Sequence, residues 1–304
     1  MKINKHFIVG ILSLLSIFSI HAQQDPQFTQ YFDNTLFVNP AYAGSTGMLS
    51  ATGIHREQWV GFAGRPSSTT FSIHSPLSYQ SVGTGLTVVS DVIGPFRQIL
   101  CYGDFSYSLR FKNKSKLSFG WKGGANFVSI GSSTLATIQN GDPNLINDTR
   151  NFVNPNFGVG LYYRASNWFI GASTPKLIEK SYDRTTTNIE KRHYFGIAGA
   201  IITLNNKWKL RPTTQFKIAV GAPTSIDLSL TGIYKEKLYL GSMYRLNAAF
   251  GVFVQVQATQ QLRIGLATEF GTTAIKKYNS GTFEFLLSYD FSFSKQGVKS
   301  PRYF

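Results

Sequence analysis

The sequence predicts an all-β protein, a transmembrane antiparallel up-and-down β-barrel of 14 strands. Three observations support this fold class: an N-terminal secretory signal, segments in which apolar and polar residues alternate, and connections that alternate between short and long. Alternation with a period of two marks a strand with one apolar and one polar face. Tight turns at one end and long loops at the other are typical of a barrel in the bacterial outer membrane.

The N-terminus has the organisation of a signal peptide. Two lysines precede an apolar run over residues 7–20, and the small residue Ala22 follows it. That run is too short for a stable transmembrane helix, and no later stretch reaches 18 consecutive apolar residues. Residues 1–22 are therefore predicted to be removed on export, and the absence of a cysteine at the junction excludes a lipoprotein.

The composition excludes several other classes. A single cysteine, Cys101, cannot form an internal disulfide framework or a thiolate metal centre, and 14% aromatic residues exclude a disordered chain. The net charge of +15 would ordinarily suggest nucleic acid or an anionic membrane as partner. Export excludes nucleic acid as the partner. Cys101 shares a strand face with Phe105 and Leu109, so we expect it to face lipid.

The alternation is clearest near the C-terminus, where aromatic and aliphatic residues occupy every second position. Within residues 282–293, one face carries Phe283, Phe285, Leu287, Tyr289, Phe291 and Phe293, and the other is largely polar. The predicted strands lie near residues 50–56, 68–77, 82–90, 98–111, 116–122, 152–164, 167–175, 192–204, 208–219, 225–234, 237–246, 252–257, 261–270 and 282–293. In a barrel the polar faces line the lumen and the apolar faces meet lipid.

The connections alternate in length along the chain. Short turns are predicted at 78–81, 112–116, 165–166, 205–207, 235–236 and 259–260, and generally longer loops at 57–67, 91–97, 131–151, 176–191, 220–224, 247–249 and 271–280. The turns are expected in the periplasm and the loops outside, and an even strand number then places both termini in the periplasm. A secreted β-sandwich is the alternative, but long strands and a sustained meander favour the barrel.

The chain divides into four parts. The signal peptide (1–22) is followed by an N-terminal periplasmic or plug segment (23–49), the barrel (50–293) and a periplasmic tail (294–304). In the second part, Phe28, Tyr31, Phe32, Leu36 and Phe37 are spaced three or four apart, which indicates a short amphipathic helix before the Asn39-Pro40 break. Two placements of this segment stay open: in the lumen or against the periplasmic mouth.

The sequence offers no catalytic, cofactor-binding or metal site. His74 and Ser75 point to opposite strand faces, so they cannot act as a pair, and His55 and His193 lie in no cluster with metal-ligand spacing. Glycines at 83, 85, 158 and 160 lie inside strands, where they permit curvature or leave room in the lumen. Five interior charges are expected to form a mutually paired network: Lys122, Arg263, Glu269, Glu284 and Asp290.

Basic residues concentrate at both predicted rims. Lys112, Lys114, Lys116, Lys207, Lys209, Lys235 and Lys237 lie in or beside short turns, and Lys176, Lys180, Arg184, Lys191, Arg192, Lys276 and Lys277 in or beside long loops. Such cations suit the phosphates of lipid headgroups. The alternative is an acidic protein docked on the periplasmic turns.

Several unusual short strings in this order resemble the PorP/SprF family of the type IX secretion system in Bacteroidetes. They begin with Gln24-Asp25-Pro26 and Gln30-Tyr31. The family signature continues through Asn39, Pro40, Ala41, Gly44, Arg56, Gln58 and Trp59, with Gly61-Phe62, Pro66, Thr70, Asp91 and Gly94-Pro95 after them. The specific part covers residues 24–96, and the ending Ser300–Phe304 is also similar. The middle strands agree only in length and pattern.

The resemblance implies a non-enzymatic outer-membrane barrel that supports secretion or surface attachment of adhesins, including gliding adhesins in some relatives. The expected partners are outer-membrane lipid, a secreted adhesin or its C-terminal sorting domain, and periplasmic components of the secretion machinery or its motor. Trp59, Phe62 and Arg65 are the candidate partner-binding residues, because large aromatic and arginine side chains dominate binding surfaces. The alternative is a passive porin or small-solute channel, which would share every compositional feature.

Overall fold

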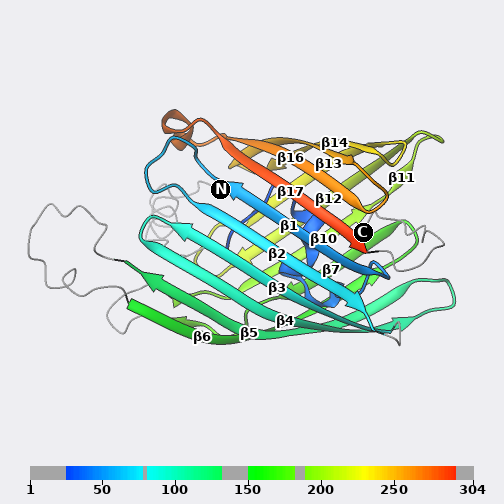
Figure 1. Ribbon diagram of the computed structural model, residues 1–304, viewed down its shortest axis with the longest axis horizontal. Coiled ribbons are helices and arrows are strands. Elements are labelled where there is room, and N and C mark those ends of the chain that lie inside the picture. Colours follow the sequence, from blue (N-terminus) through cyan, green and yellow to red (C-terminus); the bar gives the residue numbers. More distant parts are fainter. Residues whose placement is uncertain (1–24, 78–80, 132–149, 182–188, 292–304) are drawn as a thin grey trace, which may run out of the picture.

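The structure is a computed structural model that describes residues 25–77, 81–131, 150–181 and 189–291. The predicted signal peptide (1–22) and C-terminal tail (294–304) lie outside the described residues. So do residues 78–80, 132–149 and 182–188, the last of which include Arg184. The described chain forms a closed antiparallel barrel with a short segment inside it (Figure 1).

Fourteen strands build the barrel, as the sequence predicted. They are β1 Leu49–Glu57, β2 Ser67–Pro76, β3 Val82–Ile93, β4 Phe96–Arg110, β5 Lys116–Ile130, β6 Arg150–Arg164, β7 Trp168–Thr174, β10 His193–Ala200, β12 Trp208–Ala219, β13 Ser225–Tyr234, β14 Leu238–Arg245, β15 Ala249–Gln257, β16 Leu262–Gly271 and β17 Thr282–Phe291. β11 (Ile202–Thr203) continues β10 past Ile201, and β8 (Lys180–Ser181) pairs with β9 (Ile189–Glu190) in a loop.

Each strand pairs with its sequence neighbours, and the barrel closes where the last strand meets the first. Leu49 of β1 lies opposite Phe291 of β17, and the pairing continues to Glu57 opposite Phe283. Across the barrel from this closure, β10 lies between β7 and β12 and pairs with both. Closure joins the first strand to the last, so the paired strands satisfy one another's backbone groups, as a membrane-spanning sheet requires. At the loop end, β6 extends beyond its pairing with β7, which covers only Val159 to Arg164.

The two faces of the wall differ as the alternation predicted. On β17, Phe283, Phe285 and Leu287 are 44–49% exposed, whereas Glu284 and Leu286 between them are at most 3% exposed. The free Cys101 is also on the outer face. The outer face is therefore apolar and the inner face largely polar.

Among the described residues, no helix is both long and apolar enough to span a bilayer.

The connections gather at two ends, which we call the loop mouth and the turn mouth. The loop mouth carries the connections β1–β2, β3–β4, β5–β6, β7–β10, β12–β13, β14–β15 and β16–β17, and the turn mouth carries the others (Figure 1). The predicted loop 91–97 is wrong: β3 and β4 pair up to Ile93 opposite Phe96, so only Gly94 and Pro95 connect them. Gly94 adopts a positive φ of 54°, which permits this tight turn.

Residues 25–48, which we call the lumen segment, occupy the inside of the barrel. They form three short helical turns, η1 (Tyr31–Asn34), α2 (Thr35–Val38) and η2 (Pro40–Tyr42), visible in blue within the sheet in Figure 1. Phe28, Tyr31, Phe32 and Leu36 are at most 6% exposed. The expected amphipathic helix is instead a series of short turns in which polar residues such as Asn34 and Thr35 are also buried. Of the two open placements, the structure has the segment in the lumen.

Glycines in the wall leave room for the lumen segment. A Cβ on Gly120 of β5 would collide with the backbone of Ala41, and one on Gly83 of β3 with the carbonyl of Ala43. A Cβ on Gly160 would meet the side chain of Asn39. The glycines therefore serve the close approach of another backbone, one of the two roles expected from the sequence.

Candidate functional site

A buried charge cluster near the loop mouth fixes the start of the lumen segment to the wall. The carboxylate of Glu284 accepts hydrogen bonds from the backbone nitrogens of Thr29 and Gln30 at 2.6 and 3.2 Å. Arg56 donates to both Glu284 and Glu269, the latter at 2.9 Å. The hydroxyl of Thr29 also donates to Glu269 at 3.0 Å. Three barrel strands and the segment thus share one hydrogen-bonded unit.

The cluster extends around the wall through Arg245. Its guanidinium donates to both oxygens of Asp227, at 2.9 and 3.0 Å, and lies 3.3 Å from Glu269. The side chains of all three residues are at most 8% exposed. Buried charges are expensive unless they are paired, so this bidentate geometry offsets the cost of placing two carboxylates near each other.

A second group of charges holds the middle of the segment. The carboxylate of Asp33 lies 3.1 Å from Arg263 and 3.7 Å from Arg211, and Gln255 donates to its other oxygen. The guanidinium of Arg211 also lies over the ring of Phe32, 4.1 Å from its centroid. Asp33 and Phe32 belong to the lumen segment, and the two arginines belong to the wall. The wall therefore holds the middle of the segment through both ion pairs and a cation–π contact.

Lys122 of β5 fixes the end of α2. Its ammonium donates to the carbonyls of Leu36 and Phe37 at 3.3 and 3.0 Å and pairs with Asp104 at 3.3 Å. The last carbonyls of a helix have no partner within the helix, and a cation is favoured there. Lys122 thus satisfies backbone acceptors that would otherwise be buried without donors.

The predicted interior network is inside the barrel, but its members do not pair mutually. Arg263 pairs with Asp33 and Lys122 with Asp104, while Glu269 and Glu284 share Arg56. Asp290 accepts from Ser50 at 2.7 Å. The lumen segment separates the facing walls, so each charge pairs with the segment, with an adjacent strand or, as for Arg56 and Glu269, with the next strand but one.

The signature residues before β1 shape the segment. Asn39 accepts from the backbone nitrogen of Ala41 and donates to the carbonyl of Leu161 at 2.9 Å, while Pro40 opens η2. Gly44 has a φ of 68° and donates to His74. Their roles, like that of Arg56, are to fix the segment in the lumen.

The predicted partner-binding residues lie together on the loop of residues 58–66 at the loop mouth. Phe62 is 44% exposed, and the side chain of Arg65 is 46% exposed, although it pairs with Glu57 at 2.7 Å. Trp59 is only partly exposed and has a positive φ of 55°, a conformation that is uncommon for a large side chain. Phe62 and Arg65 therefore offer more accessible surface than Trp59.

This loop is held on both sides. Val60 donates to the carbonyl of Gly281, and Ser280 donates back to Val60, so the loop pairs with residues 272–281. On the other side Gly94 donates to Gly64. The backbone of Gln58, a signature residue, donates to Pro66 and closes the base of the loop. The candidate surface is therefore an ordered part of the rim.

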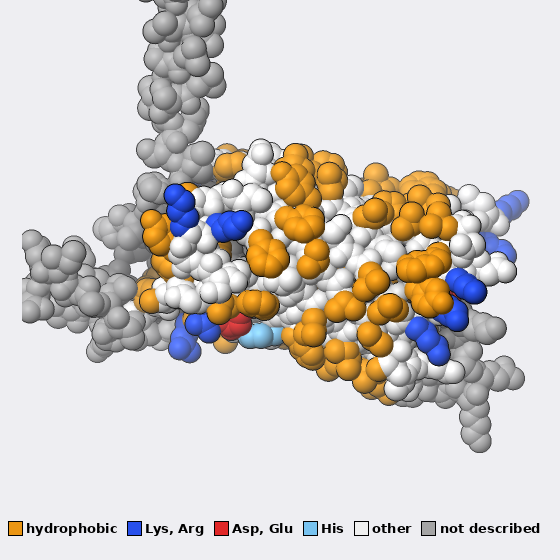
Figure 2. Space-filling model, turned by 90° about the horizontal axis from the view of Figure 1, so that it is seen from above, with side chains coloured by type: hydrophobic (Ala, Val, Ile, Leu, Met, Phe, Trp, Pro, Cys, Tyr) orange, Lys and Arg blue, Asp and Glu red, His pale blue; other side chains and the backbone are white. Residues whose placement is uncertain are grey.

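Most of the described cations that the sequence places at the rims do lie there, but Lys176 is buried at the loop end of the lumen and pairs with Asp25. Figure 2 shows Lys and Arg at both ends of the visible face, with hydrophobic side chains over the middle. Exposed cations at the turn mouth include Arg110, Lys112, Lys114, Lys207, Lys235 and Lys237, and Glu236 lies among them, paired with Lys209. The turn mouth thus presents a cationic surface.

The histidines have structural partners. His74 accepts from the backbone of Gly44, and His193 lies 3.5 Å from the carboxylate of Asp25. His55 lies on the outer face beside Thr69. Among the residues that the structure describes, no group of three or more potential ligands could hold a metal ion.

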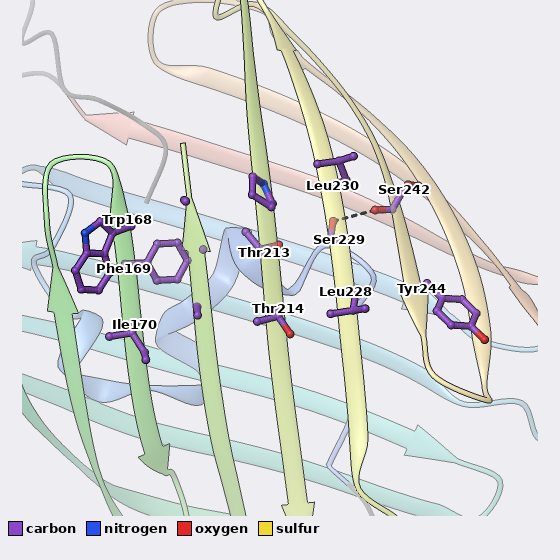
Figure 3. Close-up of a pocket in the computed structure, with 14 residues that line it drawn as sticks. Trp168, Phe169, Ile170, Thr213, Thr214, Leu228, Ser229, Leu230, Ser242 and Tyr244 are labelled. Atoms are coloured by element: carbon purple, nitrogen blue, oxygen red, sulfur yellow. Dashed lines mark hydrogen bonds between the residues drawn. The ribbon is translucent and has the colours of Figure 1, made fainter. Parts of the chain in front are cut away.

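A shallow apolar groove of about 580 Å³ lies on the outer wall of β7, β10 and β12–β14 (Figure 3). Small outward residues, among them Ala198, Ala200 and Pro212, line it, and the exposed Trp168, Leu228 and Tyr244 border it. The groove lies on the apolar outer face, which in a membrane barrel meets lipid.

The chain combines a barrel filled by its own N-terminal segment with the signature residues that hold that segment, and this combination has a counterpart among known protein families. A model of the family described as type IX secretion system membrane protein PorP/SprF matches residues 20–289. The chain belongs to the PorP/SprF family. The family match spans the lumen segment and nearly the whole barrel, so both are features of one protein type. No curated protein matches the chain.

Solved structures that resemble this PorP/SprF protein are outer-membrane barrels. They include the monoaromatic hydrocarbon channel CymD, with 10% identity, a TM-score of 0.51 and coverage of 87% of this chain and 94% of CymD. Omp33 of Acinetobacter baumannii has 9% identity, a TM-score of 0.46 and coverage of 80% and 98%, respectively. A FadL homologue of Pseudomonas aeruginosa has 12% identity, a TM-score of 0.46 and coverage of 84% and 93%. At these identities the likeness concerns the fold alone, that of an outer-membrane barrel.

The sequence did not predict that polar residues of the lumen segment bind charged side chains of the barrel wall. Thr29 contacts Glu284 and Glu269, Gln30 contacts Glu284, and Asp33 contacts Arg263, each across more than 200 positions of sequence. The available signal was the interleaving of polar and aromatic residues from Pro26 to Asn34, which is unusual for a solvated extension. Partners so distant in sequence had no local signature.

We predict that Arg56→Ala destabilises the barrel by about 3–5 kcal/mol, because it leaves Glu284 buried without its cationic partner and leaves Glu269 with Arg245 alone. The measurement is the unfolding midpoint of the purified protein in detergent. Arg65→Ala is the matched control: its ion pair is exposed, so the loss should stay below about 1 kcal/mol. Equal losses for the two variants would contradict the assignment of Arg56 as the main anchor.

Proposed function

We propose that this protein is a non-enzymatic docking barrel of the type IX secretion system, which supports secretion or cell-surface attachment of adhesin-type cargo. The observation that carries the proposal is the occupied lumen. A barrel whose inside is filled by its own N-terminal segment has its mouths, and not a channel, as surfaces for partners. The family context supplies the secretion system, and the cargo is part of the proposal.

The packing of the lumen argues against passage of cargo through the barrel. Cavities that remain between the segment and the wall include three of only about 10–20 Å³, lined by residues such as Phe37, Tyr31 and Tyr162. A cavity of this size holds about one water molecule. This occupancy also disfavours the alternative function, a passive porin.

The loop mouth is the proposed cargo surface. It carries the exposed side chains of Phe62, Arg65 and Tyr278, the last 70% exposed. Aromatic residues and arginine carry much of the binding energy in protein interfaces. The partner would be the secreted adhesin or its C-terminal sorting domain.

The turn mouth is the proposed surface for the periplasmic components of the machinery. Its exposed lysines would attract an acidic protein and raise its rate of association. Phosphates of lipid headgroups are the alternative partners of the same cations.

We predict that the purified protein is silent in a planar lipid bilayer. Deletion of residues 26–43 should produce steady conductance, because it removes the side chains that fill the lumen. The deletion variant must first be shown to fold as a barrel. Steady open pores from the intact chain would favour the porin.

We predict that replacing both Trp59 and Arg65 by Ala lowers the amount of adhesin at the cell surface. Loss of a hot spot of about 2 kcal/mol weakens binding about 30-fold. Labelling of surface adhesin on intact cells measures the effect, with barrel abundance measured in parallel. Thr224→Ala, an exposed residue of the β12–β13 loop at the same mouth, serves as the matched control. Unchanged surface adhesin in the double variant would remove this loop from the proposal.

We predict that Lys112→Glu combined with Lys237→Glu reduces the recovery of periplasmic secretion components with the purified barrel. Charge reversal replaces attraction of an acidic partner by repulsion. The matched control reverses Lys276 and Lys277 at the loop mouth. Equal recovery from both variants would indicate that the turn lysines contact lipid phosphates instead.

A further inference from the structure

The lumen segment begins at the loop mouth, not at the turn mouth where β1 begins. The carboxylate of Asp25, the first described residue, pairs with Lys176 and lies 3.5 Å from His193. Lys217 donates to the carbonyl of Asp25 at 3.2 Å. Lys176 follows the loop end of β7, His193 starts β10, and Lys217 lies two residues before the end of β12. All three partners are at the loop end of their strands.

The other end of the segment lies at the turn mouth. Gly44 donates to His74, two residues before β2 ends, and the carbonyl of Ser45 accepts from Arg164, the last residue of β6, at 2.8 Å. β1 then begins at Leu49, opposite Phe291 of β17. The segment therefore crosses the whole lumen and the chain reverses before entering β1.

This crossing differs from the expectation that both termini lie at the periplasmic mouth. The ends of the barrel itself, Leu49 and Phe291, do lie together at the turn mouth. Asp25 does not, because an extra passage through the lumen precedes the first strand. An even number of strands fixes only the two ends of the sheet.

We propose that the beginning of the lumen segment, residues 25–27, is displayed at the cell surface, within the loop mouth. In barrels of this class the short turns face the periplasm and the longer loops face outward. The segment then enters the lumen from outside and emerges in the periplasm before β1. Pro26 and Gln27 are partly exposed, whereas Phe28 is buried against Ile54 and Leu286.

The consequence is a further element of the outer surface that the loops alone do not provide. The buried Lys176, His193 and Lys217 hold Asp25 beside the ends of β7, β10 and β12, and the partly exposed Pro26 and Gln27 follow it. This inference does not depend on the cargo role, because it follows from the path of the chain and the side on which the loops lie.

Cysteine labelling in intact cells tests the proposal. In a Cys101→Ser background, Gln27→Cys, Phe62→Cys and Lys114→Cys report on the segment start, the loop mouth and the turn mouth. A membrane-impermeant maleimide is applied before and after permeabilisation of the outer membrane. We expect Gln27→Cys and Phe62→Cys to react in intact cells and Lys114→Cys only after permeabilisation.

Two results would overturn the proposal. Gln27→Cys reacting only after permeabilisation, together with Lys114→Cys, would place the segment start in the periplasm. Gln27→Cys and Phe62→Cys both reacting only after permeabilisation would show that the loop mouth is not external. Should Gln27→Cys resist the reagent throughout, a peptide tag inserted immediately before Asp25 and detected with antibody on intact cells decides the same question.

Discussion

The interaction on which the rest of the structure depends is the one between Glu284 and the lumen segment. One carboxylate accepts two backbone hydrogen bonds from the segment, at Thr29 and Gln30, and pairs with Arg56 of the neighbouring strand. Hydrogen bonds to charged groups are stronger than neutral ones, and a buried carboxylate without them would be very costly. Wall and segment therefore depend on each other. The segment supplies backbone N–H donors to the buried carboxylate of Glu284, and that carboxylate supplies the acceptors that these buried N–H groups need.

The same dependence governs the rest of the lumen. Asp33 needs Arg263 and Arg211, and the carbonyls at the end of α2 need Lys122. Glycine positions such as Gly120 allow the segment's backbone to approach closely enough for these contacts. Removing the segment would expose a set of unmatched charges on the inner wall, so the barrel and its segment are best regarded as one folded unit.

The strands were predictable from sequence, and the interior was not. Lipid contact requires apolar residues at every second position, so the alternation in a segment such as β17 predicts both the strand and the face that points outward. The partners of Asp33 are set by register across strands far apart in the chain, and no local pattern records that register. The β3–β4 connection was mispredicted because Asp91 and Arg97, polar residues typical of a loop, belong to the paired strands, opposite Gln98 and Val92, respectively. The rim position of Phe62 and Arg65 followed from loop length alone.

Buried ion pairs also bear on whether the lumen could open spontaneously. Withdrawal of the segment separates Asp33 from two arginines and Glu284 from its backbone donors. Breaking one buried charge pair costs about 3–5 kcal/mol. This cost applies to Asp33, whereas Glu284 keeps its ion pair with Arg56 and loses only the backbone hydrogen bonds. At about 1.4 kcal/mol per factor of ten, the loss at Asp33 alone would leave fewer than about one molecule in 10² open at a given moment, before any loss of apolar contact. A partner would have to supply that free energy, and only the two mouths are available for it to bind.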